Sequence, residues 1–429
     1  MKKNTVPIIL LFMLLITPSV WALQLDVETA VLYACQQSLD VETAELKKQM
    51  AFNALETISL LPSVGASLSI ASLSDAATAS STLSVDAGIS LQWSLSGSYF
   101  LEKQQNSITK NKAYTEYDSS VAEVKQKTIT AYWSLFELYE AVEDEQAFLD
   151  YADVIYTQTM HQYEASQVTE LQLAQAKLSL SSAELTLQQA KSTAVENTHV
   201  FLDDLGLDRS IALELDELPL NLQLDFTRID KLVAAYVLGT HAVQSASYAL
   251  ESAKLSQRST RIDATAPAIS AQIATNLQQN SSFSTSTNSL PIQLSASVII
   301  PLDRYLPRSQ AATSIKQADA DVEIAQLALS SVKKSLIQQA KSLAISLTHQ
   351  QQNYRILQEN FKLSKKALEL TTEAYQVGLS SFSDLESVRK ALRDTEQTIL
   401  SAEVSYVLDC YALAWLLNIS YENLLRELS

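Results

Sequence analysis

The 429-residue chain has 48 acidic and 31 basic residues, and its formal charge is −17. This balance argues against nucleic-acid binding, because such complexes depend on cationic side chains that neutralise phosphates. The two cysteines, Cys35 and Cys410, are too few for a small disulfide scaffold. They are either two buried free thiols or one bridge.

The first 22 residues have the three parts of a secretory signal peptide. Lys2 and Lys3 form a basic start, residues 8–16 an apolar run, and residues 20–22 a small-residue cleavage site. The run is too short for a membrane-spanning helix, and no later apolar stretch reaches the ~18 residues that one needs. The sequence therefore predicts an exported chain whose mature part begins near Leu23.

Two very long stretches almost lack helix-breaking residues. Residues 98–205 contain neither glycine nor proline, and residues 308–429 contain only Gly378. Apolar and small residues recur in both at the 3,4 spacing of coiled coils, for example Leu173, Ala176, Leu180, Ala183 and Leu187. We predict four long helices, at about 99–161, 169–205, 308–377 and 383–427.

A second apolar stripe runs along the first long helix, at Ile129, Tyr132, Phe136 and Tyr139. Two stripes allow a helix to contact neighbours on both sides. That arrangement suits a closed ring of helices, and it also suits the middle helix of an ordinary bundle.

Two islands between the helices alternate between apolar and small or polar residues. This period of two predicts β-strands at about 62–73, 83–97, 267–278 and 290–302. Each strand has about the ten residues that cross a bilayer as a tilted β-strand. The candidates for lipid-facing positions are Leu91, Trp93, Val298 and Ile300.

The alternation alone leaves two interpretations open. Four strands cannot close a membrane barrel, since the smallest barrels need about eight, so a membrane location would require several chains to share one barrel. Otherwise the strands form a small sheet whose apolar face packs on helices. Trp93 would then be a core tryptophan instead of part of an interfacial aromatic belt.

The two halves of the mature chain have the same layout of a helix, a strand pair and two long helices. Pro62 matches Pro267, Tyr163 matches Tyr375, and Glu170 matches Asp384. The period of about 200 residues indicates a duplicated unit, with repeats at 23–224 and 225–429.

One segment departs from this alignment. QYEASQVTELQLAQ, in the first repeat, aligns as two residues shorter than its counterpart, and it has Ser166 or Gln167 where a glycine is expected. We therefore expect its turn to differ from the turn at Gly378.

Three segments carry a family resemblance: LPSVGASLSIA, VIIPLDR and AYQVGLSSFSDLESVRKALRDTEQTILSAEVSYVLDCYALAWLL. The last has a tyrosine three residues before a glycine and an acidic–apolar pair six and seven residues after it. Together with the duplicated layout, these segments resemble the TolC-like outer-membrane efflux protein family.

The resemblance implies a mixed α+β membrane protein that assembles as a homotrimer. Each chain would contribute four transmembrane β-strands to a twelve-stranded β-barrel in the outer membrane, and coiled-coil helices to a periplasmic α-barrel. It implies an exit duct of a tripartite efflux or type I secretion system. The duct would contact outer-membrane lipid and reach an inner-membrane pump through a periplasmic adaptor protein.

The resemblance also assigns roles to residues at the predicted turns. Tyr375, Val377, Gly378 and Leu379, with Tyr163 of the first repeat, fall on the tip that docks the adaptor. Asp384 and Glu170 fall on the acids that ring the periplasmic entrance.

The assignment of Asp384 has an alternative. Three facing carboxylates would repel one another, which raises some of their pKa values and favours cations in the pore. Three positions after Asp384, where the family has a second acid, this chain has Ser387, so a double ring is not expected. Alternatively, Asp384 only caps the following helix, with Ser383 in the same role.

Patterns of catalysis or cofactor binding are absent from the sequence. None of the four histidines has a partner at metal-ligand spacing, and there is no P-loop, dinucleotide fingerprint or nucleophile elbow. We expect no enzyme activity, cofactor or metal. The alternative to a channel is a periplasmic, envelope-spanning coiled-coil structural protein without a pore.

Overall fold

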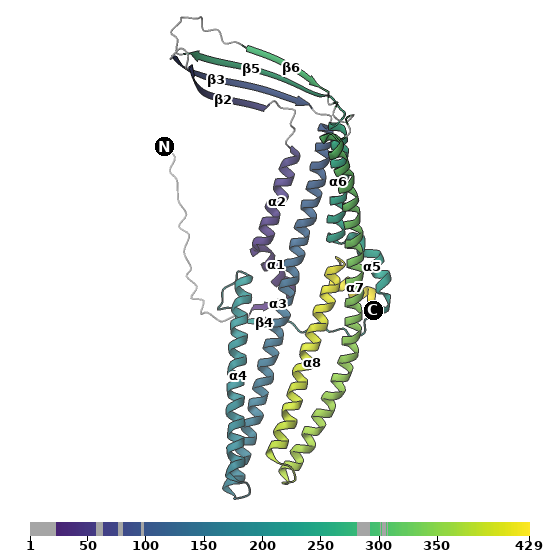
Figure 1. Ribbon diagram of the computed structural model, residues 1–429. Coiled ribbons are helices and arrows are strands. Elements are labelled where there is room, and N and C mark those ends of the chain that lie inside the picture. Colours follow the sequence, from purple (N-terminus) through teal and green to yellow (C-terminus); the bar gives the residue numbers. More distant parts are fainter. Residues whose placement is uncertain are drawn as a thin grey trace, which may run out of the picture.

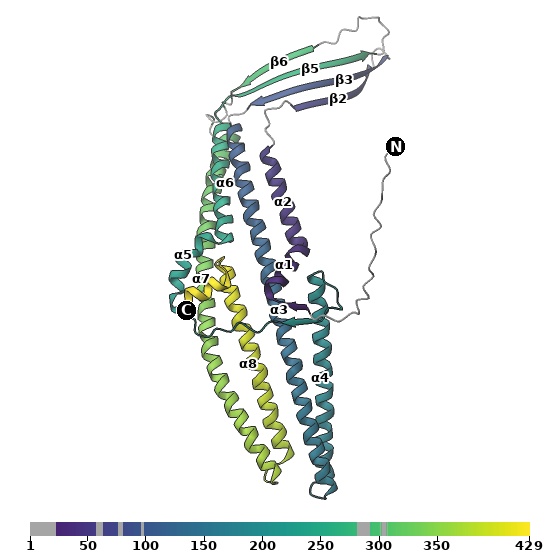
Figure 2. The ribbon, with the colours of Figure 1, turned by 180° about the vertical axis from the view of Figure 1, so that it is seen from behind.

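The computed structural model describes residues 23–56, 63–75, 80–95, 98–280, 292–300, 302, 306 and 308–429. The predicted signal peptide, residues 1–22, lies outside them. The chain forms a long helical body with a β-sheet at one end and two helix–helix turns at the other (Figure 1; seen from behind in Figure 2).

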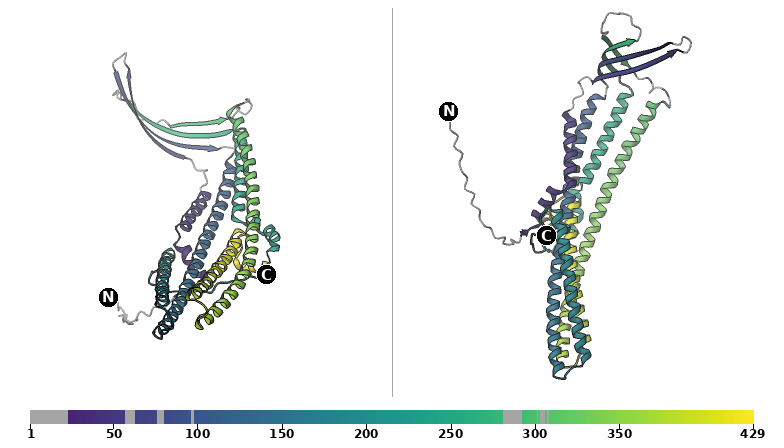
Figure 3. Two further views of the ribbon diagram at one scale, coloured as in Figure 1. Left: turned by 60° about the horizontal axis from the view of Figure 1, so that its bottom comes forward. Right: turned by 90° about the vertical axis from the view of Figure 1, so that its left-hand side faces the viewer.

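The sheet has four antiparallel strands in the order β2–β3–β5–β6. Their bounds are β2 Ser63–Asp75, β3 Ser80–Leu95, β5 Ala268–Asn280 and β6 Ile292–Ile299. All four lie where the period-two pattern predicts strands, and every end differs from the prediction by three residues or fewer. In the views of Figure 3 the sheet curves away from the helical body.

The register places most of the large apolar residues of the four strands on one face. Val64 lies opposite Leu91, Leu91 opposite Ile273, and Ile273 opposite Leu294. The next row, from Ser63 through Gln92 and Gln272 to Ser295, is polar. Because side chains alternate along a strand, the sheet has one apolar face and one polar face.

Helices of the same chain leave the apolar face uncovered. Val64 is 71% exposed and Leu294 is 74% exposed. The predicted lipid-facing residues Leu91 and Trp93 lie on this face with Val298, and Trp93 is 37% exposed. The alternatives of a sheet packed on helices and of a core tryptophan are therefore wrong for the described chain. Ile300 lies one residue beyond the end of β6.

The helical body contains nine α-helices among the described residues. They are α1 Val27–Gln37, α2 Leu39–Glu56, α3 Tyr99–Glu164, α4 Glu170–Asp204, α5 Ile229–Tyr236, α6 His241–Asp263, α7 Gln310–Gln376, α8 Phe382–Leu416 and α9 Tyr421–Leu428. Two short 3₁₀ helices, η1 Phe226–Arg228 and η2 Val237–Gly239, flank α5. With 66 residues, α3 is ~100 Å long at ~1.5 Å per residue.

The helices form a layer whose members change at mid-length. Near the sheet the packing order is α2–α3–α6–α7, and in the distal half it is α4–α3–α8–α7 (Figures 1 and 3). The helices α3 and α7 run through both halves. The predicted second stripe on α3 is confirmed, because Tyr132 packs against β1 and α4 while Tyr139 bonds Thr198 of α4 at 3.1 Å.

A short parallel strand pair at mid-length closes the core of the first repeat. The strands β1 Leu23–Leu25 and β4 Leu213–Leu215 were not predicted, since three residues are too few to show a period. The buried Tyr132 hydroxyl donates a hydrogen bond to the Leu25 carbonyl (2.8 Å) and accepts one from the Asp216 amide (2.7 Å). Burial raises the pKa of Tyr132 to about 12.

The last predicted helix, at about 383–427, is wrong in one respect. It is two helices, because Asn418 adopts a left-handed conformation (φ +55°) and Ser420 caps α9. The stacked rings of Tyr411 and Tyr421, with centroids 4.1 Å apart, fold α9 back onto α8.

Among the described helices, α8 alone is long and apolar enough to span a membrane by length and composition. Its apolar residues include Val407 and Leu413, which are fully buried against α7 and neighbouring segments. We therefore interpret α8 as a core helix. Its Cys410 is buried and Cys35 is half-buried, and both thiols are free.

Candidate functional site

The body ends in two turns, which we call the distal turns. The first (residues 165–169) joins α3 to α4, and the second (residues 377–381) joins α7 to α8. Ser166 in the first turn and Gly378 in the second are both left-handed, with φ of +57° and +75°. Each donates its amide to a tyrosine carbonyl three residues earlier, Tyr163 at 2.8 Å and Tyr375 at 3.0 Å.

The capping of the following helices is also the same in both turns. Thr169 and Gln172 form a capping box at the start of α4, and Ser381 and Asp384 form one at the start of α8. The two turns are thus equivalent residue by residue at a constant offset of 212, from Tyr163/Tyr375 to Gln172/Asp384. A helix that ends at a left-handed residue satisfies its last carbonyls in this way.

This equivalence corrects the alignment of the first repeat. The first turn is not two residues shorter, and it has the same conformation as the second, with Ser166 in the place of Gly378. The residue equivalent to Asp384 is Gln172. Glu170 is the first residue of α4 and is equivalent to Phe382.

Asp384 caps α8, and its place in an entrance ring stays a prediction. Its Oδ2 accepts hydrogen bonds from the Ser381 hydroxyl (2.6 Å) and the Ser381 amide (3.0 Å). These bonds hold the pKa of Asp384 below its usual range. The capping serine is Ser381 and not the predicted Ser383, because α8 begins at Phe382.

The predicted docking residues divide into exposed and buried ones. Val377 and Leu379 are 70% and 83% exposed, and no atom lies within 4 Å of a Cβ placed on Gly378. Tyr163 is also exposed. Tyr375 is buried: its ring packs edge-on against Phe382, and its hydroxyl lies 3.4 Å from that of Thr159 on α3.

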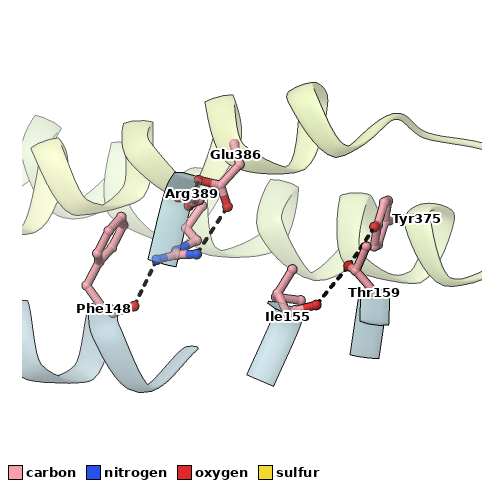
Figure 4. Close-up of polar contacts among 7 residues, drawn as sticks. Phe148, Ile155, Thr159, Tyr375, Glu386 and Arg389 are labelled. Atoms are coloured by element: carbon pink, nitrogen blue, oxygen red, sulfur yellow. Dashed lines mark hydrogen bonds and ion pairs between the residues drawn. The ribbon is translucent and has the colours of Figure 1, made fainter. Parts of the chain in front are cut away.

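Arg389 joins the two helix pairs just above the distal turns (Figure 4). Its side chain is buried between α8 and α3, and its Nη2 donates a hydrogen bond of 2.8 Å to the Phe148 carbonyl. The guanidinium carbon lies 3.7 Å from the centroid of the Phe148 ring. Glu386 pairs with Arg389 at 3.1 Å and accepts a hydrogen bond from Ser179 of α4 at 2.8 Å. Arg389 therefore links α8 to α3 directly, and its partner Glu386 extends the link to α4.

The sequence analysis did not single out Arg389, although the spacing of apolar residues along α8 indicates that it is buried. It lies four residues after Leu385, so both share one face of α8 and both are buried. An arginine on the buried face of an otherwise apolar stripe indicates a paired, structurally specific charge.

Two unpartnered apolar stripes follow the outer edges of the distal half. On α4 they are the exposed residues Leu171, Leu178 and Leu185; on α7 they are Ile356, Leu363 and Leu370. Both stripes repeat every seven residues, which is the spacing of a coiled-coil seam. Since α4 and α7 are the outermost helices of the layer, none of the described helices covers either stripe.

A metal centre is not formed in the described part of the chain, where no group of three or more histidine, cysteine, aspartate or glutamate side chains could hold an ion.

Comparison with known proteins reveals the fold. No family model matches the sequence, and a search of curated proteins finds no match.

Solved structures do match. The outer membrane protein VceC of Vibrio cholerae has a TM-score of 0.72 at 15% identity, over 92% of this chain and 96% of VceC. The CmeC channel of Campylobacter jejuni has a TM-score of 0.70 at 16% identity, over 94% and 88%. The MtrE channel of Neisseria gonorrhoeae, in its open state, has a TM-score of 0.69 at 15% identity, over 92% and 89%.

The chain has the TolC-like fold. The fold-level expectation of long coiled-coil helices with a separate strand domain is confirmed along more than nine-tenths of the chain.

The different residues at the equivalent positions of the distal turns predict opposite responses to substitution. Gly378→Ala should lower the free energy of unfolding by about 1 kcal/mol, because a Cβ is strained in the left-handed region. Ser166→Gly should raise it by a similar amount, since the strain already present is relieved. Denaturant unfolding of the purified protein measures both. Effects of the same sign would contradict the equivalence of the turns.

Removal of Arg389 should loosen the distal ends of the helix pairs. In Arg389→Met the Phe148 carbonyl and Glu386 lose their cationic partner, which should cost about 3 kcal/mol. Amide hydrogen exchange in residues 382–392 should accelerate. The matched control is the exposed neighbour in Lys390→Met, which should stay within about 0.5 kcal/mol of the unchanged protein. Equal effects of both substitutions would show that Arg389 makes no specific contribution.

Proposed function

We propose that the protein is a trimeric outer-membrane channel, the exit duct of a tripartite efflux or type I secretion system. The observation that carries the proposal is the four-stranded sheet with an exposed apolar face and two unpaired edges. An apolar face of this size is stable when it lies against lipid.

The sheet edges explain why several chains are needed. Within the described residues β2 and β6 each pair with one strand only, so each leaves a row of backbone amides and carbonyls without a partner. Unpaired backbone groups are too costly in a bilayer. If β2 of one chain pairs with β6 of the next, three chains close a barrel of twelve strands, well above the minimum of about eight.

The helical edges fit the same arrangement. The α4 stripe begins at Leu171, beside the first distal turn, and the α7 stripe ends at Leu370, close to the second. Placed side by side in neighbouring chains, α4 and α7 run antiparallel, and Leu178 lies level with Leu370. This packing would bury both stripes and close the helices into a periplasmic α-barrel.

Solved structures with the same fold support a channel. CmeC, OprN and MtrE are each described as an outer membrane channel. A periplasmic, envelope-spanning structural protein is the less favoured function, since a rigid spacer has no need of an exposed apolar β-face.

The distal turns are the proposed contact with a periplasmic adaptor, through which an inner-membrane pump would supply the energy. The exposed side chains available for this contact are Tyr163, Val377 and Leu379. Tyr375 contributes indirectly, by fixing the second turn against α3. Asp384, and more peripherally Glu170, would lie near the entrance when three chains assemble.

The experiment that tests this function is single-channel recording of the purified protein in a planar bilayer under a salt gradient. We expect discrete conductance steps with a reversal potential that favours cations, because the chain is strongly acidic. In Asp384→Ala the selectivity should fall if three carboxylates line the entrance. Absence of conductance in both proteins, from a chain that extracts without detergent, would favour the structural alternative.

The apolar sheet face makes a matched prediction about membrane assembly. In Leu91→Asp a carboxylate would face lipid, at a cost of up to about 3 kcal/mol, so less protein should reach the membrane fraction. The adjacent Gln92→Asp places the same charge on the polar face and should assemble normally. Equal recovery of the two variants would contradict a lipid-facing role for the apolar side.

A further inference from the structure

The two helix pairs of the distal half meet along α3 and α8, where carboxylates accumulate. We call the contact the acidic joint and define it by six residues: Glu140, Glu143, Asp144 and Glu145 on α3, and Glu396 and Glu403 on α8. Glu140 interacts electrostatically with Glu403 across the joint, and Glu396 interacts with Asp144. These six lie between the Arg389 contact and the core at mid-length.

Few cations face these carboxylates. Arg393 of α8 forms an ion pair with Glu145, and Lys365 of α7 lies near Glu396. Glu403 accepts a hydrogen bond of 2.6 Å from the Tyr354 hydroxyl of α7. On the α4 side Lys191 bonds the uncharged Gln146 at 3.2 Å. Six carboxylates therefore share two recorded cations.

The Glu145–Arg393 pair is itself incompletely satisfied. Oε2 of Glu145 and Nε of Arg393 are buried without a hydrogen-bond partner among the described residues. Glu145 is only 3% exposed. Buried polar atoms without partners destabilise a contact, so the one ion pair recorded across the joint does not offset the excess of negative charge.

The surroundings disfavour the ionised form of several joint carboxylates. Burial, followed by repulsion from Glu143, Asp144 and Glu403, raises the pKa of Glu140. Burial and then repulsion from Glu143 raise the pKa of Asp144, although Arg393 opposes the shift. Burial and the charge of Asp144 raise the pKa of Glu396. Burial raises that of Glu145 despite Arg393. A carboxyl group with a raised pKa binds its proton more tightly when the helices are together than when they are apart.

We propose that the acidic joint is a pH-sensitive hinge that holds the two helix pairs together when its carboxylates are protonated and loosens as they ionise. The stabilising effect of protonation is fully present below the ordinary carboxylate range. It is lost as the pH rises through the raised values, above which the ionised carboxylates repel one another. The apolar core at mid-length and Arg389 near the turns hold the helices on either side of it.

This inference rests on the proposed channel, because separation of the helix pairs at their distal turns would widen its periplasmic end. A partner that docks at the distal turns would then need less energy to separate the helix pairs, because the carboxylates of the joint already repel one another. The hinge adds a conformational role for residues that neither the entrance nor the docking surface uses.

The test measures the separation of the distal turns in the full-length protein. Spin labels at Gln167→Cys and Leu379→Cys, in a background with Cys35→Ser and Cys410→Ala, report the distance by pulsed electron paramagnetic resonance. Dilution with unlabelled chains restricts the signal to pairs within one chain. From about pH 4 to about pH 8, which spans the ionisation of carboxylates, we expect the distance to lengthen and its distribution to broaden.

Two variants decide whether the joint is responsible. Glu140→Gln/Asp144→Asn/Glu396→Gln removes three of its carboxylates and should keep the short distance at both pH values. Its free energy of unfolding at the higher pH should also exceed that of the unchanged protein. The control, Asp153→Asn/Glu184→Gln/Asp394→Asn, removes three exposed carboxylates of α3, α4 and α8 outside the joint and should respond like the unchanged protein.

Either of two results would overturn the hinge: a distance independent of pH in the unchanged protein, or the same pH response in the joint variant. Neither requires ion flow. A protein that conducts without a pH-dependent distance disproves the hinge alone, and one that shows the distance change without conductance disproves the channel alone.

Discussion

The free edges of the chain are the constraint on which the rest of the structure depends. A sheet with an apolar face and unpaired edge strands is unstable alone, both in water and in lipid. The same chain also leaves apolar seams on its two outermost distal helices, α4 and α7. The edge strands β2 and β6 lie on opposite sides of the sheet, and α4 and α7 lie on opposite sides of the distal helical layer (Figure 1). Repetition of the layer around an axis satisfies all of them at once, which makes the isolated chain a segment of a ring.

Duplication gives the segment its two equivalent helix pairs. The distal turns keep the same hydrogen bonds, left-handed residue and capping box at a constant offset, although Ser166 and Gly378 differ. The charged contacts between the pairs are confined to α3, α4 and α8. There Arg389 stabilises the contact near the turns, and the acidic joint weakens it farther along. The layer is thus rigid along its helices and adjustable between its pairs.

Much of the fold could be predicted because its signals are long. Strands of eight or more alternating residues and helices of 35 to 67 residues show their period clearly. Features encoded in few residues were missed. The strands β1 and β4 have three residues each, and the break between α8 and α9 depends on Asn418, which is neither glycine nor proline.

The candidate site was predicted less well than the fold. The alignment assumed that a left-handed turn needs glycine, so Ser166 shifted the first turn by two residues and paired Glu170 with Asp384. The family pattern placed Tyr375 at the docking tip without showing that its side chain points into the α3 contact. Arg389 and the acidic joint depend on contacts between residues more than 240 positions apart, which a single sequence does not show.

Cross-linking between the outer edges tests the central claim most directly. Leu178→Cys on α4 and Leu370→Cys on α7, with the native cysteines replaced, lie on opposite edges of one chain, so a disulfide between them must join neighbouring chains. Oxidation of the protein in membranes should give dimers and then a trimer that resists further growth. Each single-cysteine variant is the control and should form no trimer. If the double variant stays monomeric while the protein remains folded and in the membrane, the ring of chains is wrong.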